Sequence, residues 1–128
     1  MKRLLLVSLA ILFLFAVMVN AAEMRFAVAS SDETAEASVS NEAAKCPYYL
    51  IFDSKGELTE VIDNPYKNAS GGAGPSAANF LAQRGVTIVI AGSFGSKMIN
   101  ALESKGVVHF ESKGSVGDAV KKALEGGQ

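Results

Sequence analysis

The chain has 128 residues, 12 basic and 13 acidic side chains, a formal net charge of −1 and one cysteine. This length suits a single compact domain with a modest core. A lone cysteine excludes a framework of internal disulfides, and the absence of a basic excess makes nucleic acid a poor partner.

The N-terminal residues have the pattern of a secretory signal peptide. Lys2 and Arg3 precede a run over residues 4–19 that is apolar except for Ser8, and Asn20-Ala21-Ala22 follows, so we predict cleavage after Ala21. The run has 16 residues, fewer than the roughly 20 that span a bilayer, and an uncleaved membrane anchor is the alternative. Residues 22–128 would then form one secreted or periplasmic domain.

Three strands are predicted first in the remaining chain. They cover Arg25–Ser30, Tyr48–Asp53 and Leu58–Asp63, and the last two suit a hairpin with Gly56 at a positive φ angle. Residues 31–45 form a long loop between the first two strands. Its acidic residues lack the spacing of a calcium loop, so we interpret the loop as a solvated acidic segment; they are Glu33, Glu36 and Glu42.

Helices and strands alternate in the second half. A glycine-rich segment, residues 68–74, leads into a helix with Pro75 in its first turn and Gly85 after its end. Apart from Thr87, residues 86–91 are apolar, as in a central parallel strand that is covered on both faces. A helix over residues 96–105, a strand over residues 107–111 and a helix capped by Ser115 complete the chain.

This order predicts an α/β domain of three layers around a five-stranded mixed sheet. Because a crossover through a helix is right-handed, the strand over residues 86–91 should lie beside the first strand. The predicted strand order is 3-2-1-4-5, with the second strand antiparallel to the rest.

Two glycine-bearing turns are predicted to face one pocket. Ligands of such sheets bind where the chain departs in opposite directions from neighbouring strands, and both turns precede helices, whose free N–H groups favour an anion. The candidate residues are Gly71, Gly72, Ala73 and Gly74 in the first turn, and Gly92, Ser93, Phe94 and Gly95 in the second.

Cys46 begins the second strand, beside the place where the first strand should end. We therefore predict a soft metal ligand or anchor at the rim of the pocket, against the alternative of a buried, inert thiol. A single thiol could also link two chains through a disulfide or a shared metal. Met98 and His109 are further candidate ligands for copper(I), although the spacing of Met98 from Leu102 favours core packing.

The ordered motifs resemble the dinitrogenase iron-molybdenum cofactor biosynthesis family. The resemblance lies in residues 24–29, in the stretch CPYYLIFD that starts at Cys46, in Gly-Ala-Gly at residues 72–74, and in residues 89–92, 94–95 and 117–120. It implies a ribonuclease H-like fold and a metal-sulfur cluster as cargo; the related orange proteins hold a molybdenum-copper sulfide anion. Relatives often have histidine where this chain has Gly71.

We therefore expect an exported protein that binds a metal-sulfur cluster or a soft metal ion, of the molybdenum, copper or iron type. It would act as a carrier, store or assembly scaffold. The alternative is a non-catalytic protein-interaction module of the same fold. We predict no enzymatic activity, because one histidine, one cysteine and no paired carboxylates leave few residues for catalysis.

Overall fold

A computed structural model describes residues 23–126, so the predicted signal peptide, residues 1–21, lies outside the described residues. The elements, in chain order, are β1 (Phe26–Ser30), β2 (Tyr48–Phe52), β3 (Leu58–Asp63), α2 (Ala73–Gln83), β4 (Ile88–Ala91), α3 (Ser96–Ser104), β5 (Val108–Glu111) and α4 (Val116–Leu124). Among them, no helix has both the length and the apolar character needed to span a bilayer.

The strands form one sheet in the order β3-β2-β1-β4-β5. β2 is antiparallel to β1 and β3, whereas β1, β4 and β5 are parallel. The predicted mixed sheet and its strand order are confirmed. All five residues of β1 are buried, as expected for the central strand of a sheet covered on both faces.

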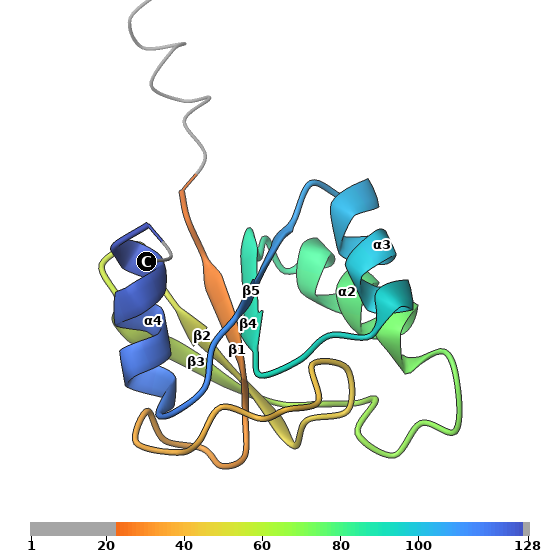
Figure 1. Cartoon of the computed structure of the whole chain (residues 1–128), viewed down its shortest axis with the longest axis horizontal. Coiled ribbons are helices and arrows are strands. Elements are labelled where there is room, and N and C mark those ends of the chain that lie inside the picture. Colours follow the sequence, from red (N-terminus) through yellow and green to blue (C-terminus); the bar gives the residue numbers. More distant parts are fainter. Residues whose placement is uncertain (1–22, 127–128) are drawn as a thin grey trace, which may run out of the picture.

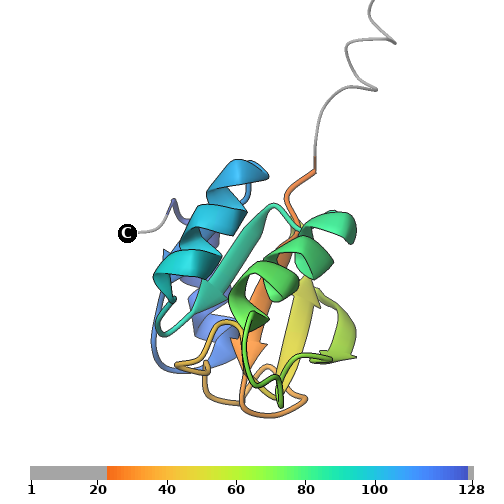
Figure 2. The same cartoon turned by 90° about the vertical axis from the view of Figure 1, so that its right-hand side faces the viewer.

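Helices cover both faces of the sheet, with α2 and α3 on one side and α4 on the other (Figures 1 and 2). Side chains of β1 alternate between the two faces. Ala27 and Ala29 belong to the core beneath α2 and α3, which also contains Leu81. Phe26 and Val28 belong to the core beneath α4.

The local signals that end and begin the elements are also confirmed. Gly56 in the hairpin has a φ of 83°, and Gly85 and Gly106, which follow α2 and α3, have φ angles of 79° and 70°, a region that costs glycine little. The Ser115 side chain accepts a hydrogen bond from the Asp118 amide at 3.3 Å, which caps α4.

The long loop, residues 31–45, contains no helix and no named strand, and its three glutamates are exposed. It crosses the carboxyl ends of β1 and β4. The Ser40 amide donates to the Ala29 carbonyl, and the Gly92 amide donates to the Ser40 carbonyl, both at 2.8 Å. This strap, residues 38–43, covers the crevice between the two strands, and an open pocket begins beside it at residues 44–45.

Candidate functional site

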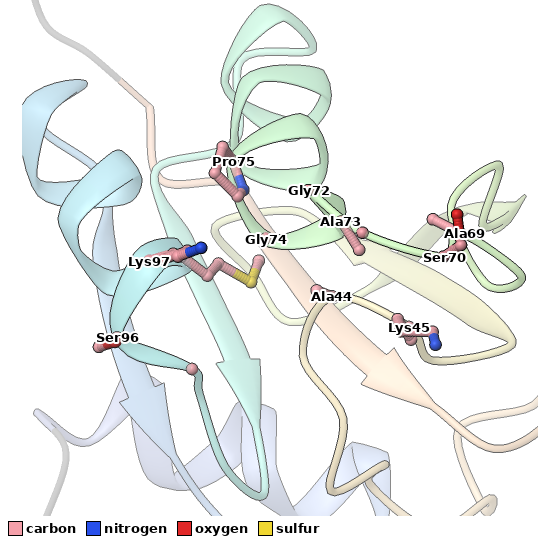
Figure 3. Close-up of a pocket in the computed structure, with 13 residues that line it drawn as sticks. Ala44, Lys45, Ala69, Ser70, Gly72, Ala73, Gly74, Pro75, Ser96 and Lys97 are labelled. Carbon is pink, nitrogen blue, oxygen red and sulfur yellow. The ribbon is translucent and has the colours of Figure 1, made fainter.

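The pocket lies where α2 and α3 begin and has a volume of about 440 Å³. That volume is within the range of small-molecule sites. Figure 3 shows the two helix starts facing the segment that holds Ala44 and Lys45. Its lining residues are Ala44, Lys45, Ala69, Ser70, Gly71, Gly72, Ala73, Gly74, Pro75, Gly95, Ser96, Lys97 and Met98.

The start of α2 presents amides without partners. Gly72 precedes the helix with a φ of 70° and makes no side-chain cap. The first bond within the helix runs from the Ser76 amide to the Gly72 carbonyl at 3.3 Å, and Pro75 has no N–H to offer. Within residues 23–126 the amides of Ala73 and Gly74 therefore have no hydrogen-bond partner.

The start of α3 has the same character. Gly95 precedes the helix and offers no side chain to cap it. The first bond within the helix runs from the Ile99 amide to the Gly95 carbonyl at 3.1 Å. In the described part of the chain, the amides of Ser96, Lys97 and Met98 lack partners. Two helix starts thus direct unpaired donors and partial positive charge toward one pocket.

Gly74 brings the two helix starts together. A Cβ atom added there would lie 3.1 Å from the backbone nitrogen of Met98 and 3.2 Å from its Cβ, closer than ordinary van der Waals contact. With a side chain at this position, α2 and α3 would have to separate by a few tenths of an ångström. The close approach of the two sets of free amides is therefore easiest with glycine here.

The start of α4 is different and serves as a comparison within the same molecule. The Val116 amide donates to the Ala37 carbonyl and the Gly117 amide to the Ala35 carbonyl, both at 2.9 Å. The next amide, that of Asp118, is bound by the Ser115 side chain. All three early donors of α4 are paired, so the free donors of α2 and α3 are not a general property of this fold.

The charged groups at the pocket are both basic. Lys45 and Lys97 line it, together with the hydroxyl-bearing Ser70 and Ser96. Sequence reasoning did not select these four residues. Lys97 carries a signal that could have done so, because a cation in the first turn of a helix opposes the helix dipole and is unfavourable unless an anion compensates it.

The two predicted glycine turns contribute unequally. Gly71, Gly72, Ala73 and Gly74 all line the pocket, but of the second turn only Gly95 does. Gly92 is covered by the Asn41 side chain, and Phe94 packs against the His109 ring. Ser93 lines a smaller adjacent hollow of about 220 Å³. Gly92 and Phe94 therefore do not line the pocket as we expected; the strap covers Gly92, and Phe94 packs toward β5.

The prediction that Cys46 lies at the rim is also wrong. Its exposed fraction is 0%, and its Sγ lies 3.8 Å from the Ala43 carbonyl oxygen and 3.8 Å from Nδ2 of Asn64. Burial raises the pKa of the thiol from 9.0 to about 12. Lys45 lines the pocket, whereas the side chain of the next residue, Cys46, lies in the core. Neither an accessible ligand nor a disulfide to a second chain fits this placement.

Met98 and His109 are not brought together around a metal. Met98 is 1% exposed and packs in the same core as Leu102, as its spacing predicted, although it also forms part of the pocket wall. The His109 ring lies edge-on to Phe94, with the ring centroids 5.3 Å apart. Within residues 23–126, no group of three or more histidine, cysteine or acidic side chains could hold a metal ion.

Asn64 positions the pocket wall and was missed by the sequence reasoning. It is 1% exposed, and its Nδ2 donates to the Ala44 carbonyl at 2.9 Å and to the Cys46 carbonyl at 2.8 Å. Its Oδ1 accepts from the Tyr66 amide at 2.9 Å. An asparagine just after a strand normally predicts a turn, so these bonds across 18 and 20 residues gave no local signal.

Comparison with known sequences identifies the relationship. A family described as dinitrogenase iron-molybdenum cofactor matches residues 24–126. The chain belongs to the dinitrogenase iron-molybdenum cofactor family. The resemblance seen in the sequence is thereby confirmed, over nearly all of the described residues.

Individual relatives agree with this assignment. The apo form of the orange protein from Desulfovibrio gigas is 27% identical, with a TM-score of 0.76 over 84% of this chain and 92% of that one. An NMR structure of a Thermotoga protein is 29% identical, with a TM-score of 0.69 over 81% of this chain and 90% of that one. An uncharacterized Methanocaldococcus jannaschii protein is 28% identical over 86 residues, 64% of this chain and 73% of that one.

This member of the dinitrogenase iron-molybdenum cofactor family has room for a side chain to begin at Gly71, where the resemblance leads us to expect histidine. A Cβ atom added at Gly71 would meet no other atom within 4 Å. Gly71 is therefore not required by packing, in contrast to Gly74.

Proposed function

We propose that this family member binds an anionic metal-sulfur cluster in the pocket at the starts of α2 and α3, as a carrier, store or assembly scaffold. The observation that carries the proposal is the convergence of unpaired amides from two helix starts on one pocket. Such amides bind anions without any change in the backbone. The family relationship supports a cluster as the cargo.

The chemistry of the pocket wall favours a complete anion over a bare metal ion. Its polar groups are amides, the hydroxyls of Ser70 and Ser96, and the ammonium groups of Lys45 and Lys97. No carboxylate, imidazole or thiol lines this pocket among the described residues. A metal bound here would therefore bring its own sulfide ligands, and the protein would hold those ligands from outside.

We also propose that the protein is not an enzyme and that it acts outside the cytoplasm. The first proposal rests on the pocket wall, whose described residues include no histidine, cysteine or carboxylate to serve as a general base or thiol nucleophile. The second rests on the pattern of residues 1–21 and is tested by the mass of the protein recovered from its host. A chain that begins at Ala22 would support export, and a chain that keeps the apolar run would contradict cleavage.

Binding of tetrathiomolybdate, alone and with copper(I), tests the main proposal through the visible absorption of the bound cluster. Lys97→Glu replaces a cation at the pocket with an anion, whereas Lys105→Glu makes the same change at the far end of α3, about 12 Å along the helix axis. A change of two charges at about 5 Å is worth roughly 1.7 kcal/mol in water for a monovalent ion. We expect at least a tenfold loss of affinity in Lys97→Glu and little change in Lys105→Glu.

The same variant separates binding from folding. Glutamate in the first turn of α3 interacts favourably with the helix dipole, by roughly 0.3–1 kcal/mol, so Lys97→Glu should be slightly more stable than the wild type while it binds more weakly. Equal losses in both lysine variants would contradict the assigned site. A wild type that retains no cluster or metal would instead favour the interaction module.

A further inference from the structure

β5 is an edge strand, and on one of its two sides no described strand pairs with it. It is the last strand of the sheet among residues 23–126, and it pairs only with β4. Figure 1 shows it outermost, with α4 on one side of the sheet and α2 and α3 on the other. Val108 at its start is 57% exposed, the largest exposure of any large apolar side chain in the described residues. An open edge of this kind is a template for another strand.

The direction of the backbone groups along β5 identifies its free donors. The Val108 amide donates to the Thr87 carbonyl at 2.9 Å and the Ser112 amide to the Ala91 carbonyl at 3.0 Å, so these residues face β4. Because this direction alternates along a strand, the N–H and C=O groups of His109 and Glu111 point away from β4. Two residues with free backbone groups thus flank Phe110.

We propose that a second copy of this chain pairs with β5 in antiparallel orientation, across a two-fold axis at Phe110. In this register His109 lies opposite Glu111 of the partner subunit, and the two residues exchange both backbone hydrogen bonds. The axis repeats that exchange on the other side of Phe110. All the free backbone groups of β5 are then paired, which a shift by one residue would not achieve.

The side chains match in the same register. On one face His109 meets Glu111 of the partner subunit, a pairing of a basic with an acidic side chain. On the other face the two Phe110 rings meet across the axis, and each lies beside an apolar hollow formed by Ile88, Val108, Phe110, Ala123 and Gly126. The exposed apolar surface of β5 is thus covered by its own copy.

The opposite edge of the sheet does not offer this match. β3 carries Glu60 and Asp63 and no basic residue, so self-pairing could not match an acidic side chain with a basic one from the same strand. Glu60 is already engaged by Arg25 and Arg84, each at 3.3 Å. The geometry therefore selects β5. An edge of four residues predicts a weak, concentration-dependent dimer.

Engineered cysteines test the register directly. Cys46 is buried, so an added thiol is the only accessible one among the described residues. In Phe110→Cys, the two thiols would face each other across the axis at a Cβ separation of roughly 4.5–5.5 Å, near disulfide range. In Val108→Cys, the thiols would be about 13 Å apart along the strand, although Val108 is the more exposed position.

We expect a disulfide-linked dimer from Phe110→Cys under mild oxidation and little from Val108→Cys. Greater cross-linking of Val108→Cys would overturn the register, because random collision favours the exposed site. Loss of fold in Phe110→Cys is checked by circular dichroism, and the charge variants below test the same register without touching the apolar face.

Sedimentation equilibrium of the wild type and charge variants tests the pairing itself. His109→Glu places two acidic side chains opposite each other at both symmetric positions, and we expect association to weaken by about tenfold. Adding Glu111→Lys to His109→Glu restores opposite charges and should restore association. Val61→Lys, on the other edge, should leave it unchanged. A monomeric wild type at all concentrations, or a double variant no better than His109→Glu, would overturn the proposal.

Discussion

Gly74→Ala tests whether the contact between α2 and α3 creates the pocket. The added Cβ would lie 3.1 Å from the Met98 nitrogen, so the helix starts must separate by a few tenths of an ångström to reach ordinary contact. Overpacking of this kind costs about 1–3 kcal/mol. Alanine regains up to about 1 kcal/mol through its helix propensity. The net loss of unfolding free energy should be roughly 0–2 kcal/mol.

Urea denaturation of Gly74→Ala and of Gly71→Ala measures this loss against a matched control. Gly71 lies in the same turn, but a Cβ atom there meets nothing, so Gly71→Ala should unfold like the wild type. Because the free amides of the two helices move apart, Gly74→Ala should also bind tetrathiomolybdate several-fold more weakly. A Gly74→Ala protein with wild-type affinity would refute the link between the contact and the pocket.

Three further changes probe the buried supports of the site. The Cys46 thiol has a pKa of about 12 in the folded state, above the usual 9.0, so between pH 9 and pH 10 the unfolded state loses this proton while the folded state keeps it. The unfolding free energy of the wild type should therefore fall over this pH range by up to about 1.4 kcal/mol more than that of Cys46→Ala, as measured by urea titration. Asn64→Ala leaves the carbonyls of Ala44 and Cys46 without their donor and should lower the unfolding free energy by about 2–4 kcal/mol. The control variant Asn68→Ala should leave the unfolding free energy unchanged. Gly71→His should change the thermal midpoint by no more than a few degrees, since a Cβ atom at this position meets no other atom within 4 Å; a large drop in calorimetry would contradict that.

The architecture followed from short-range features of the sequence. Glycines after the apolar runs, the Ser115 cap and the uninterrupted apolar character of residues 88–91 each report on their own neighbourhood. The right-handed crossover through the first helix then selected a single strand order among those that the elements allow. These features predicted the sheet and the two helix starts, and hence the place of the pocket within the fold.

The errors arose where distant segments meet. No local pattern shows that Asn64 reaches across 18 residues to the Cys46 carbonyl, or that Asn41 covers Gly92. The position of a residue along a strand shows which end of the sheet it lies at, but not whether its side chain points to the pocket or into the core. The prediction therefore placed Cys46 correctly next to the pocket, but its side chain points into the core and not toward the pocket.

The strap over the ends of β1 and β4 is fastened by main-chain bonds that involve Ala29, Ser40 and Gly92, with a further bond from the Ala43 amide to the Ser93 carbonyl at 3.3 Å. Bonds of this type do not depend on the side chains of Ala29, Ser40 and Ala43, whereas Gly92 lies too close to Asn41 to accept a side chain. The loop that covers the crevice beside the pocket can thus keep its path while most of its amino acids diverge, and relatives less than 30% identical can share the fold with different pocket walls.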